Sequence, residues 1–142
     1  MTPERMKQRT KSFGLGVLRL VDQLSKTRPA DPIARQLLRA GTSVGANYRA
    51  ACRSRTDGDF LARMGVVEEE ADEALYWVEL LLEAGLTTAQ RTAVLVQEGN
   101  ETLSMVMASI NTVKSRMGKG KGTRAPRPGH VAQTPMNPKS EI

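Results

Sequence analysis

Residues 56–85 read TDGDFLARMGVVEEEADEALYWVELLLEAG. Apolar residues recur in this stretch at alternating steps of four and three, which places them on one face of a helix. Thr56 and Asp59 approximate a capping box at its start, and Gly85 is a typical left-handed cap at its end. The stretch therefore predicts one long amphipathic helix. Its apolar face consists of Phe60, Met64, Val67, Ala71, Ala74, Val78 and Leu81.

Two helices are predicted before this stretch. The first begins with Thr2 as cap and Pro3 at the first helical position, and it ends near Lys26 because the following prolines cannot continue a helix. The second begins with Asp31 as cap and Pro32 behind it. Their apolar faces consist of Met6, Thr10, Phe13, Val17, Leu20 and Leu24, and of Ile33, Leu37, Ala40, Val44, Asn47 and Ala51.

A fourth helix is predicted after residue 86, where Thr87 and Gln90 form a second capping box. Its apolar face consists of Val94, Val96, Gly99, Leu103, Val106, Ile110 and Val113. Short loops between four such helices make consecutive helices antiparallel neighbours. No strand pattern competes with this reading. We therefore expect an all-α, antiparallel up-down-up-down four-helix bundle over residues 1–116.

The remaining residues, 117–142, are expected to form a disordered basic tail. Gly, Pro, Lys and Arg dominate there (GKGKGTRAPRPGH, residues 118–130), with almost nothing apolar to bury. Lys119, Lys121, Arg124 and Arg127 would add sequence-independent affinity for RNA or DNA. A plain solubilising extension is the alternative.

Cysteine and hydropathy patterns indicate a cytoplasmic protein. Cys52 is the only cysteine, which excludes an intrachain disulfide, and it reads as a small buried hydrophobe. No apolar run is long enough to span a membrane, and the first residues lack the apolar core of a signal peptide. We expect no membrane association.

Charge is segregated along the chain. Residues 1–56 contain 12 Lys and Arg against 3 Asp and Glu, whereas residues 57–116 contain 4 against 11 and residues 117–142 contain 5 against 1. This asymmetry predicts a polyanionic partner, a self-complementary assembly, or both.

The residue inventory argues against catalysis. The sole histidine, His130, lies in the predicted tail, where nothing holds it against a nucleophile. No histidine follows the acidic residues of the third helix at the spacing of a helical di-metal site, and no phosphate-binding loop occurs. We expect no enzyme, no metal and no cofactor. The acidic residues concerned are Glu68, Glu69, Glu70, Asp72 and Glu73, with Glu98 and Glu101 on the fourth helix.

Two arginine-rich stripes are the predicted binding surface. Small or polar residues separate the cations of each stripe, which would let a phosphate backbone approach the helices. No aromatic residue interleaves with them, so base stacking is not expected. The stripes consist of Arg5, Arg9, Arg19 and Lys26 on the first helix and Arg35, Arg39, Arg49 and Arg53 on the second. The alternatives are an ordinary solvated face, or pairing with Glu69, Glu73 and Glu83 of a neighbouring subunit.

Asn47 and the apolar segment 75–82 lead to two further structural predictions. Asn47 interrupts an apolar face, and a buried amide there must be hydrogen-bonded, either between helices or to a local backbone break. The segment LYWVELLL, residues 75–82, is apolar nearly all the way round its helix. Tyr76, Trp77 and Leu80 would be left in water by a single bundle, so they are the predicted interface of a homo-oligomer.

Residues 40–85 resemble the four-helix-bundle proteins encoded in intervening sequences of bacterial 23S ribosomal RNA genes. That family closes its second helix with a Ser-(Ile/Val)-x-x-Asn block and ends its Glu-rich third helix in Leu-Tyr-Trp-(Leu/Val)-x-Leu-Leu. The matching positions are Ser43, Val44, Asn47, Phe60, Leu61, Glu70, Glu73, Leu75, Tyr76, Trp77, Leu81 and Leu82. Ala50 departs from the pattern, because a Glu is frequent there, and the loss makes the second helix more basic.

The resemblance implies a compact bundle that forms homopentamers and has no established enzymatic activity. A related branch is the accessory variability determinant of diversity-generating retroelements, a basic pentamer that binds nucleic acid and a reverse transcriptase. Two functions are therefore expected. The first is binding of structured RNA or DNA through the basic helices and tail, and the alternative is an accessory scaffold for a protein partner such as a reverse transcriptase.

Overall fold

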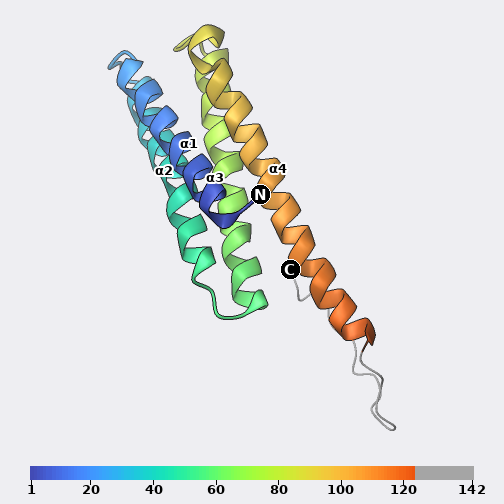
Figure 1. Ribbon diagram of the computed structural model, residues 1–142. Helices are drawn as coiled ribbons and strands as arrows, with labels where there is room; N and C mark the ends of the chain where they lie inside the picture. Colours follow the sequence, from blue (N-terminus) through green and yellow to red (C-terminus); the bar gives the residue numbers. More distant parts are fainter. Residues whose placement is uncertain (124–142) are drawn as a thin grey trace.

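The computed structural model describes residues 1–123, with side chains through residue 119, as four helices (Figure 1). These are α1 (Pro3–Gln23), α2 (Ala30–Cys52), α3 (Asp57–Glu83) and α4 (Ala89–Thr123). Each helix packs against the next one in sequence, and α1 also packs against α4, so the four close into a ring. The predicted antiparallel four-helix bundle is confirmed.

The α4 helix continues past residue 116, where the bundle was expected to end, and residues 124–142 lie outside the described part. No strand occurs in the described part. None of its helices combines the length and the apolar character that crossing a bilayer requires.

Three predicted helix ends are confirmed. The Thr2 hydroxyl accepts a hydrogen bond from the Arg5 backbone N–H at 3.2 Å, and the Thr56 hydroxyl accepts one from the Asp59 N–H at 3.0 Å. Each bond satisfies one of the backbone donors that the first helical turn leaves free. At the end of α3, Gly85 has φ +74°, a left-handed conformation that favours glycine.

Two predicted caps are wrong. The α2 helix begins one residue before the expected cap Asp31, and the Thr27 hydroxyl accepts from the Ala30 N–H at 3.3 Å. At the start of α4, Thr88 is the cap, because its hydroxyl accepts the N–H three residues later at 3.2 Å. Thr87 is buried instead, and its hydroxyl has no hydrogen-bond partner in the described part.

The core follows the predicted faces of α1 and α3, apart from Phe60, which is only half-buried. Ile33 of α2 and Val96 and Leu103 of α4 are also only half-buried, and at two further positions a neighbouring residue is buried instead. On α2 the buried residue is Tyr48, while Asn47 is half-buried and donates from Nδ2 to the Ser43 carbonyl of its own helix at 2.9 Å, so it does not bridge helices. On α4 the buried residue is Leu95, whereas the predicted Val94 is 70% exposed.

Glycines set the close approach of α1 and α2. A Cβ at Gly41 would lie 2.6 Å from Val17 Cγ2, and a Cβ at Gly45 would lie 3.4 Å from the Thr10 carbonyl. A Cβ at Gly14 would lie 3.6 Å from the Gly41 carbonyl oxygen. The two helices therefore meet backbone to backbone, and the pairing fixes which residues of one lie beside which of the other.

Candidate nucleic-acid interface

The predicted helix cations lie on the surface. Arg9 is half-buried, and the others are exposed: Arg5, Arg19, Lys26, Arg35, Arg39, Arg49 and Arg53. Lys119, which was predicted in the disordered tail, is exposed on α4 instead. Arg124, Arg127 and His130, together with the side chain of Lys121, lie outside the described part. Exposure alone does not make a binding surface, so the partners of these cations decide which of them are free.

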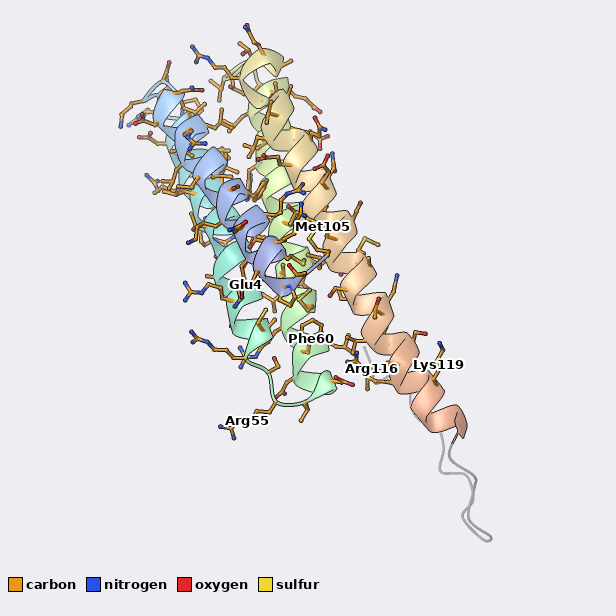
Figure 2. All side chains as sticks on the ribbon, viewed as in Figure 1. Glu4, Arg55, Phe60, Met105, Arg116 and Lys119 are labelled. Carbon is orange, nitrogen blue, oxygen red and sulfur yellow. The ribbon has the colours of Figure 1, made fainter. Side chains whose placement is uncertain are left out.

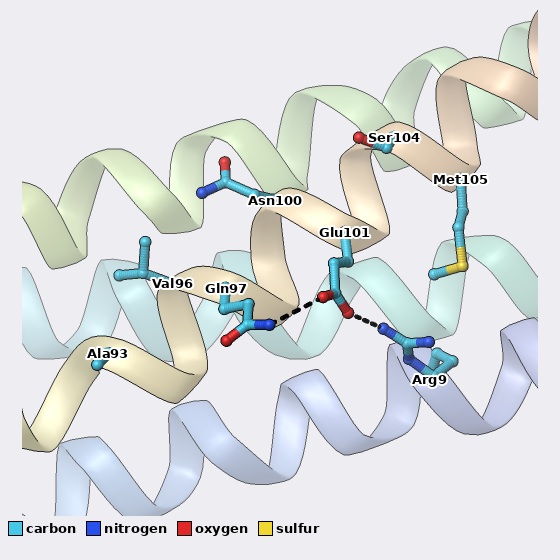
Figure 3. A pocket seen from close by; sticks show the side chains of 8 residues that line it. All are labelled: Arg9, Ala93, Val96, Gln97, Asn100, Glu101, Ser104 and Met105. Atoms are coloured by element: carbon cyan, nitrogen blue, oxygen red, sulfur yellow. Dashed lines mark hydrogen bonds and ion pairs between the residues drawn. The ribbon is translucent and has the colours of Figure 1, made fainter.

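Arg9 of α1 is engaged within the chain. Its guanidinium pairs with the Glu101 carboxylate of α4, which also accepts a hydrogen bond from Gln97 Nε2 at 3.1 Å (Figure 3). Beside this pair lies a shallow, open groove of about 680 Å³. It is lined by Arg9, Ala93, Val96, Gln97, Asn100, Glu101, Ser104 and Met105. The groove is not enclosed and contains no convergent set of catalytic groups.

Arg39 of α2 is engaged with α3. Its guanidinium lies 3.1 Å from Glu70 Oε1 and also pairs with Glu73, while Trp77 Nε1 donates to Glu73 Oε2 at 2.9 Å. The indole hydrogen bond and the Arg39 charge lower the pKa of Glu73 below its usual 4.5. Of the acidic residues expected to face a neighbouring subunit, Glu73 thus already has a cationic partner in its own chain.

These two pairs separate the predicted stripes. Arg9 reaches α4, whereas Arg39 reaches α3, so the two arginines lie on opposite flanks of the α1–α2 pair. Arg9 and Arg39 therefore do not belong to one continuous basic surface.

A different group of cations meets across the glycine contact. Gly45 faces the Lys11 backbone nitrogen, and Arg49 follows Gly45 by one helical turn, on the same face. Lys7 precedes Lys11 by one turn, so the antiparallel pairing brings Lys7 beside Arg49, and Arg53 continues the row. We call Lys7, Lys11, Arg49 and Arg53 the α1–α2 basic cluster.

The α1–α2 basic cluster is short of carboxylates. Lys7 lies 3.5 Å from Glu4, whereas Lys11, Arg49 and Arg53 form no ion pair with any residue in the described part. Sequence reasoning missed Lys7 and Lys11. The spacing of Gly41 and Gly45, one turn apart on α2, is the signal that would have placed α1 against this face.

The three residues of the predicted oligomer interface differ in exposure. Tyr76 is 53% exposed, but Trp77 and Leu80 are half-buried, and Trp77 packs against the core as well as bonding Glu73. The rings of Tyr76 and Trp77 meet edge to face with centroids 5.1 Å apart. Tyr76 is therefore the residue of this group most available to a partner.

The described residues show no metal-binding group. No three His, Cys, Asp or Glu side chains within residues 1–119 come together as ligands. Cys52 is half-buried and carries a free thiol. Burial, followed by the neighbouring Cys52 thiol, raises the pKa of the Tyr48 phenol.

Comparisons with known proteins cover most of the bundle. A family model described as the 23S rRNA-intervening sequence protein matches residues 4–108. A crystal structure of a protein of unknown function from the S23 ribosomal protein family of Bacteroides thetaiotaomicron is similar at 27% identity, with a TM-score of 0.70. The similarity covers 74% of this chain and 97% of that one. No curated protein matches the chain.

Proposed function

This chain belongs to the 23S rRNA-intervening sequence protein family, and from that premise we propose that it is a non-enzymatic protein that binds structured RNA or DNA through the phosphate backbone. The observation that carries the proposal is the α1–α2 basic cluster, in which cations from two helices meet. Like charges placed together in this way repel one another, and a polyanion would relieve that repulsion.

The chemistry of the cluster favours backbone contacts over base recognition. Guanidinium groups match phosphate oxygens in a bidentate geometry, and the short side chain of the exposed Ala46 leaves the α2 surface low near Arg49 and Arg53. The aromatic residues of α1 and α2, Phe13 and Tyr48, are buried and cannot stack on bases. The proposed contact set therefore contains the cluster and the exposed Arg5, Arg19 and Arg35, but neither Arg9 nor Arg39.

Fluorescence anisotropy with a labelled RNA duplex over a salt series tests the proposal. The double variant Lys11→Glu/Arg49→Glu should weaken binding at least about tenfold at low salt and reduce the salt slope by about 2, one unit for each lost contact. The matched control is Arg63→Glu/Arg91→Glu, which makes the same charge change at exposed positions of α3 and α4.

The outcomes of this experiment distinguish a localised phosphate-binding surface from an effect of overall charge and from a protein scaffold. Equal losses in the two double variants would show that only overall charge matters and would contradict a localised surface. Wild-type affinity that is flat across the salt series would exclude phosphate-driven recognition. Absence of binding would favour the alternative function, a scaffold for a protein partner such as a retroelement reverse transcriptase.

Self-association is the second part of the proposal, with a homopentamer as the state implied by the family resemblance. Its support is Tyr76, an aromatic residue that the bundle leaves exposed on α3. Light scattering should show that Tyr76→Asp dissociates the homo-oligomer into monomers. Glu79→Asp, on the same helix, is the control and should leave the oligomer intact. A monomeric wild-type protein would contradict it.

A further inference from the structure

The C-terminal part of α4 extends beyond the bundle. Figure 1 shows α4 continuing past the loop that joins α2 and α3. Val113 is the last buried residue of α4 in the described part, and a Cβ at Gly118 would meet nothing within 4 Å. The family match ends at residue 108, before this segment begins. The α4 extension, residues 114–123, therefore lies outside the part of the chain that the family model matches.

One ion pair fixes the extension beside the α2–α3 loop. Arg116 donates from a guanidinium nitrogen to Asp57 Oδ1 at 3.0 Å, and Asp57 is the first residue of α3. The loop immediately before it carries Arg53 and Arg55. Lys119 follows Arg116 by three residues and so lies on the same side of α4. Figure 2 shows Arg55, Arg116 and Lys119 at one end of the molecule.

The charges at this end are mostly positive. Arg53, Arg55 and Lys119 are exposed and form no ion pair within the described part, whereas the nearby acids are Asp57, which is paired, and Asp59. Cations late in a helix also complement its dipole, which is a sufficient reason for Lys119 alone. It does not account for Arg53 and Arg55, which belong to a different element.

We infer that Arg53, Arg55 and Lys119, at the end of the bundle where Arg116 pairs with Asp57, form a second phosphate-binding site, the end site, which binds the phosphodiester backbone of a nucleic-acid duplex. The inference rests on the proposed function. Arg53 belongs to both the end site and the α1–α2 basic cluster, so the two are continuous along the last turns of α2. One duplex lying along the cluster continues across the α2–α3 loop onto the α4 extension.

The test compares charge reversals in the full chain, using RNA and DNA duplexes of one sequence. Arg55→Glu/Lys119→Glu should weaken binding of both duplexes about tenfold at low salt and reduce the salt slope by about 2. The matched control is Lys114→Glu/Arg63→Glu. Lys114 lies on the same extension but on the opposite side from Arg116, since two residues correspond to about 200° of helix rotation.

Comparison with Lys11→Glu/Arg49→Glu distinguishes failure of the end site from failure of the proposed function. If Arg55→Glu/Lys119→Glu binds like its control while Lys11→Glu/Arg49→Glu loses affinity, the end site is refuted and the proposed function stands. If neither double variant differs from its control, both are refuted. A loss for one duplex only would refute backbone recognition at the end site. Circular dichroism spectra that overlay the wild type establish that each variant folds.

Discussion

Substitution of Gly41 by alanine should destabilise the bundle, although alanine favours helices. Gly41 lies in the middle of α2, where Gly→Ala in a helix is ordinarily worth about 1 kcal/mol. The new Cβ would, however, lie 2.6, 2.9 and 3.0 Å from the Cγ2, Cγ1 and Cβ atoms of Val17. Val17 is fully buried and β-branched, so it cannot rotate away without leaving its preferred rotamer.

The expected magnitude is the difference between these two effects. Overpacking in a well-packed core costs about 1–3 kcal/mol. Subtracting the helix-propensity gain of about 1 kcal/mol leaves a net destabilisation of about 0–2 kcal/mol for Gly41→Ala. Gly65→Ala in α3 is the control, because a Cβ there meets nothing within 4 Å. It should stabilise the protein by about 0.5–1 kcal/mol.

Urea denaturation followed by circular dichroism, at one protein concentration for all variants, measures these effects. Val17→Ala removes Cγ2 and Cγ1, the two atoms nearest to the new methyl group, and leaves Cβ at 3.0 Å beside the space that they vacate. In that background Gly41→Ala should therefore change sign and stabilise the protein by about 0.5–1 kcal/mol. Equal stabilisation by Gly41→Ala and Gly65→Ala in the wild-type background would refute the close α1–α2 contact on which the basic cluster depends.

Three further outcomes are expected. Leu95→Ala should cost about 2–5 kcal/mol in urea denaturation and Val94→Ala less than about 0.5, and the reverse order would show that α4 is rotated. Gly85→Ala should cost about 1–2 kcal/mol of unfolding free energy, because φ +74° is strained for alanine; an unchanged midpoint would contradict this. The pKa of Glu73 is lower in the folded protein, so its ion pair stabilises at neutral pH and the contribution disappears as pH falls through that pKa. Because the pair is partly exposed, Glu73→Gln should cost less than about 1 kcal/mol at pH 7 and progressively less as pH falls through the pKa of Glu73, and a pH-independent difference would refute it.

The helices could be predicted from the sequence because periodicity and several caps agreed. Thr2, Thr56 and Gly85 each combined the right residue type with an apolar repeat starting or stopping beside it. The second and fourth helices began elsewhere because the sequence offered competing hydrogen-bond acceptors: the Thr27 hydroxyl accepts the Ala30 N–H ahead of Asp31, and Thr88 caps α4 in place of Thr87. Residue type alone does not distinguish two hydroxyls next to each other.

The residues that each helix turns toward the core were harder to predict than the positions of the helices in the sequence. On α2, the amide of Asn47 and the phenol of Tyr48 are neighbours, and the larger apolar body of Tyr48 takes the buried position. On α4, Val94 and Leu95 are both apolar, so the repeat could be drawn through either. Burial by the partner helix decides such cases, and a single sequence does not contain that information.

The residues of the candidate site could not be identified from local sequence patterns, because their ion-pair partners and neighbouring cations lie far away in the sequence. Arg9 and Arg39 fitted the arginine stripes as well as Arg49 did, but carboxylates 92 and 34 residues further along the chain neutralise them. Lys11 did not belong to either stripe, and only the contact with Gly45 brings it to Arg49. Charge blocks indicated which helices are basic, whereas the pairing of the helices determines which cations remain free.

The distribution of ion pairs explains why positive charge gathers where it does. Three of the four boundaries between neighbouring helices carry an ion pair that crosses from one helix to the other in the described part: Arg39–Glu70, Arg116–Asp57 and Arg9–Glu101. The α1–α2 boundary has none among the described pairs, since both helices are basic and most of the acids of the described part lie on α3 and α4. Glycine contacts rather than ion pairs hold that boundary together, so α1 and α2 can bring their cations close, with Glu4 beside Lys7 as the one carboxylate paired with the cluster in the described part. A polyanion lying along this boundary would supply the negative charge that the other three boundaries obtain from within the chain.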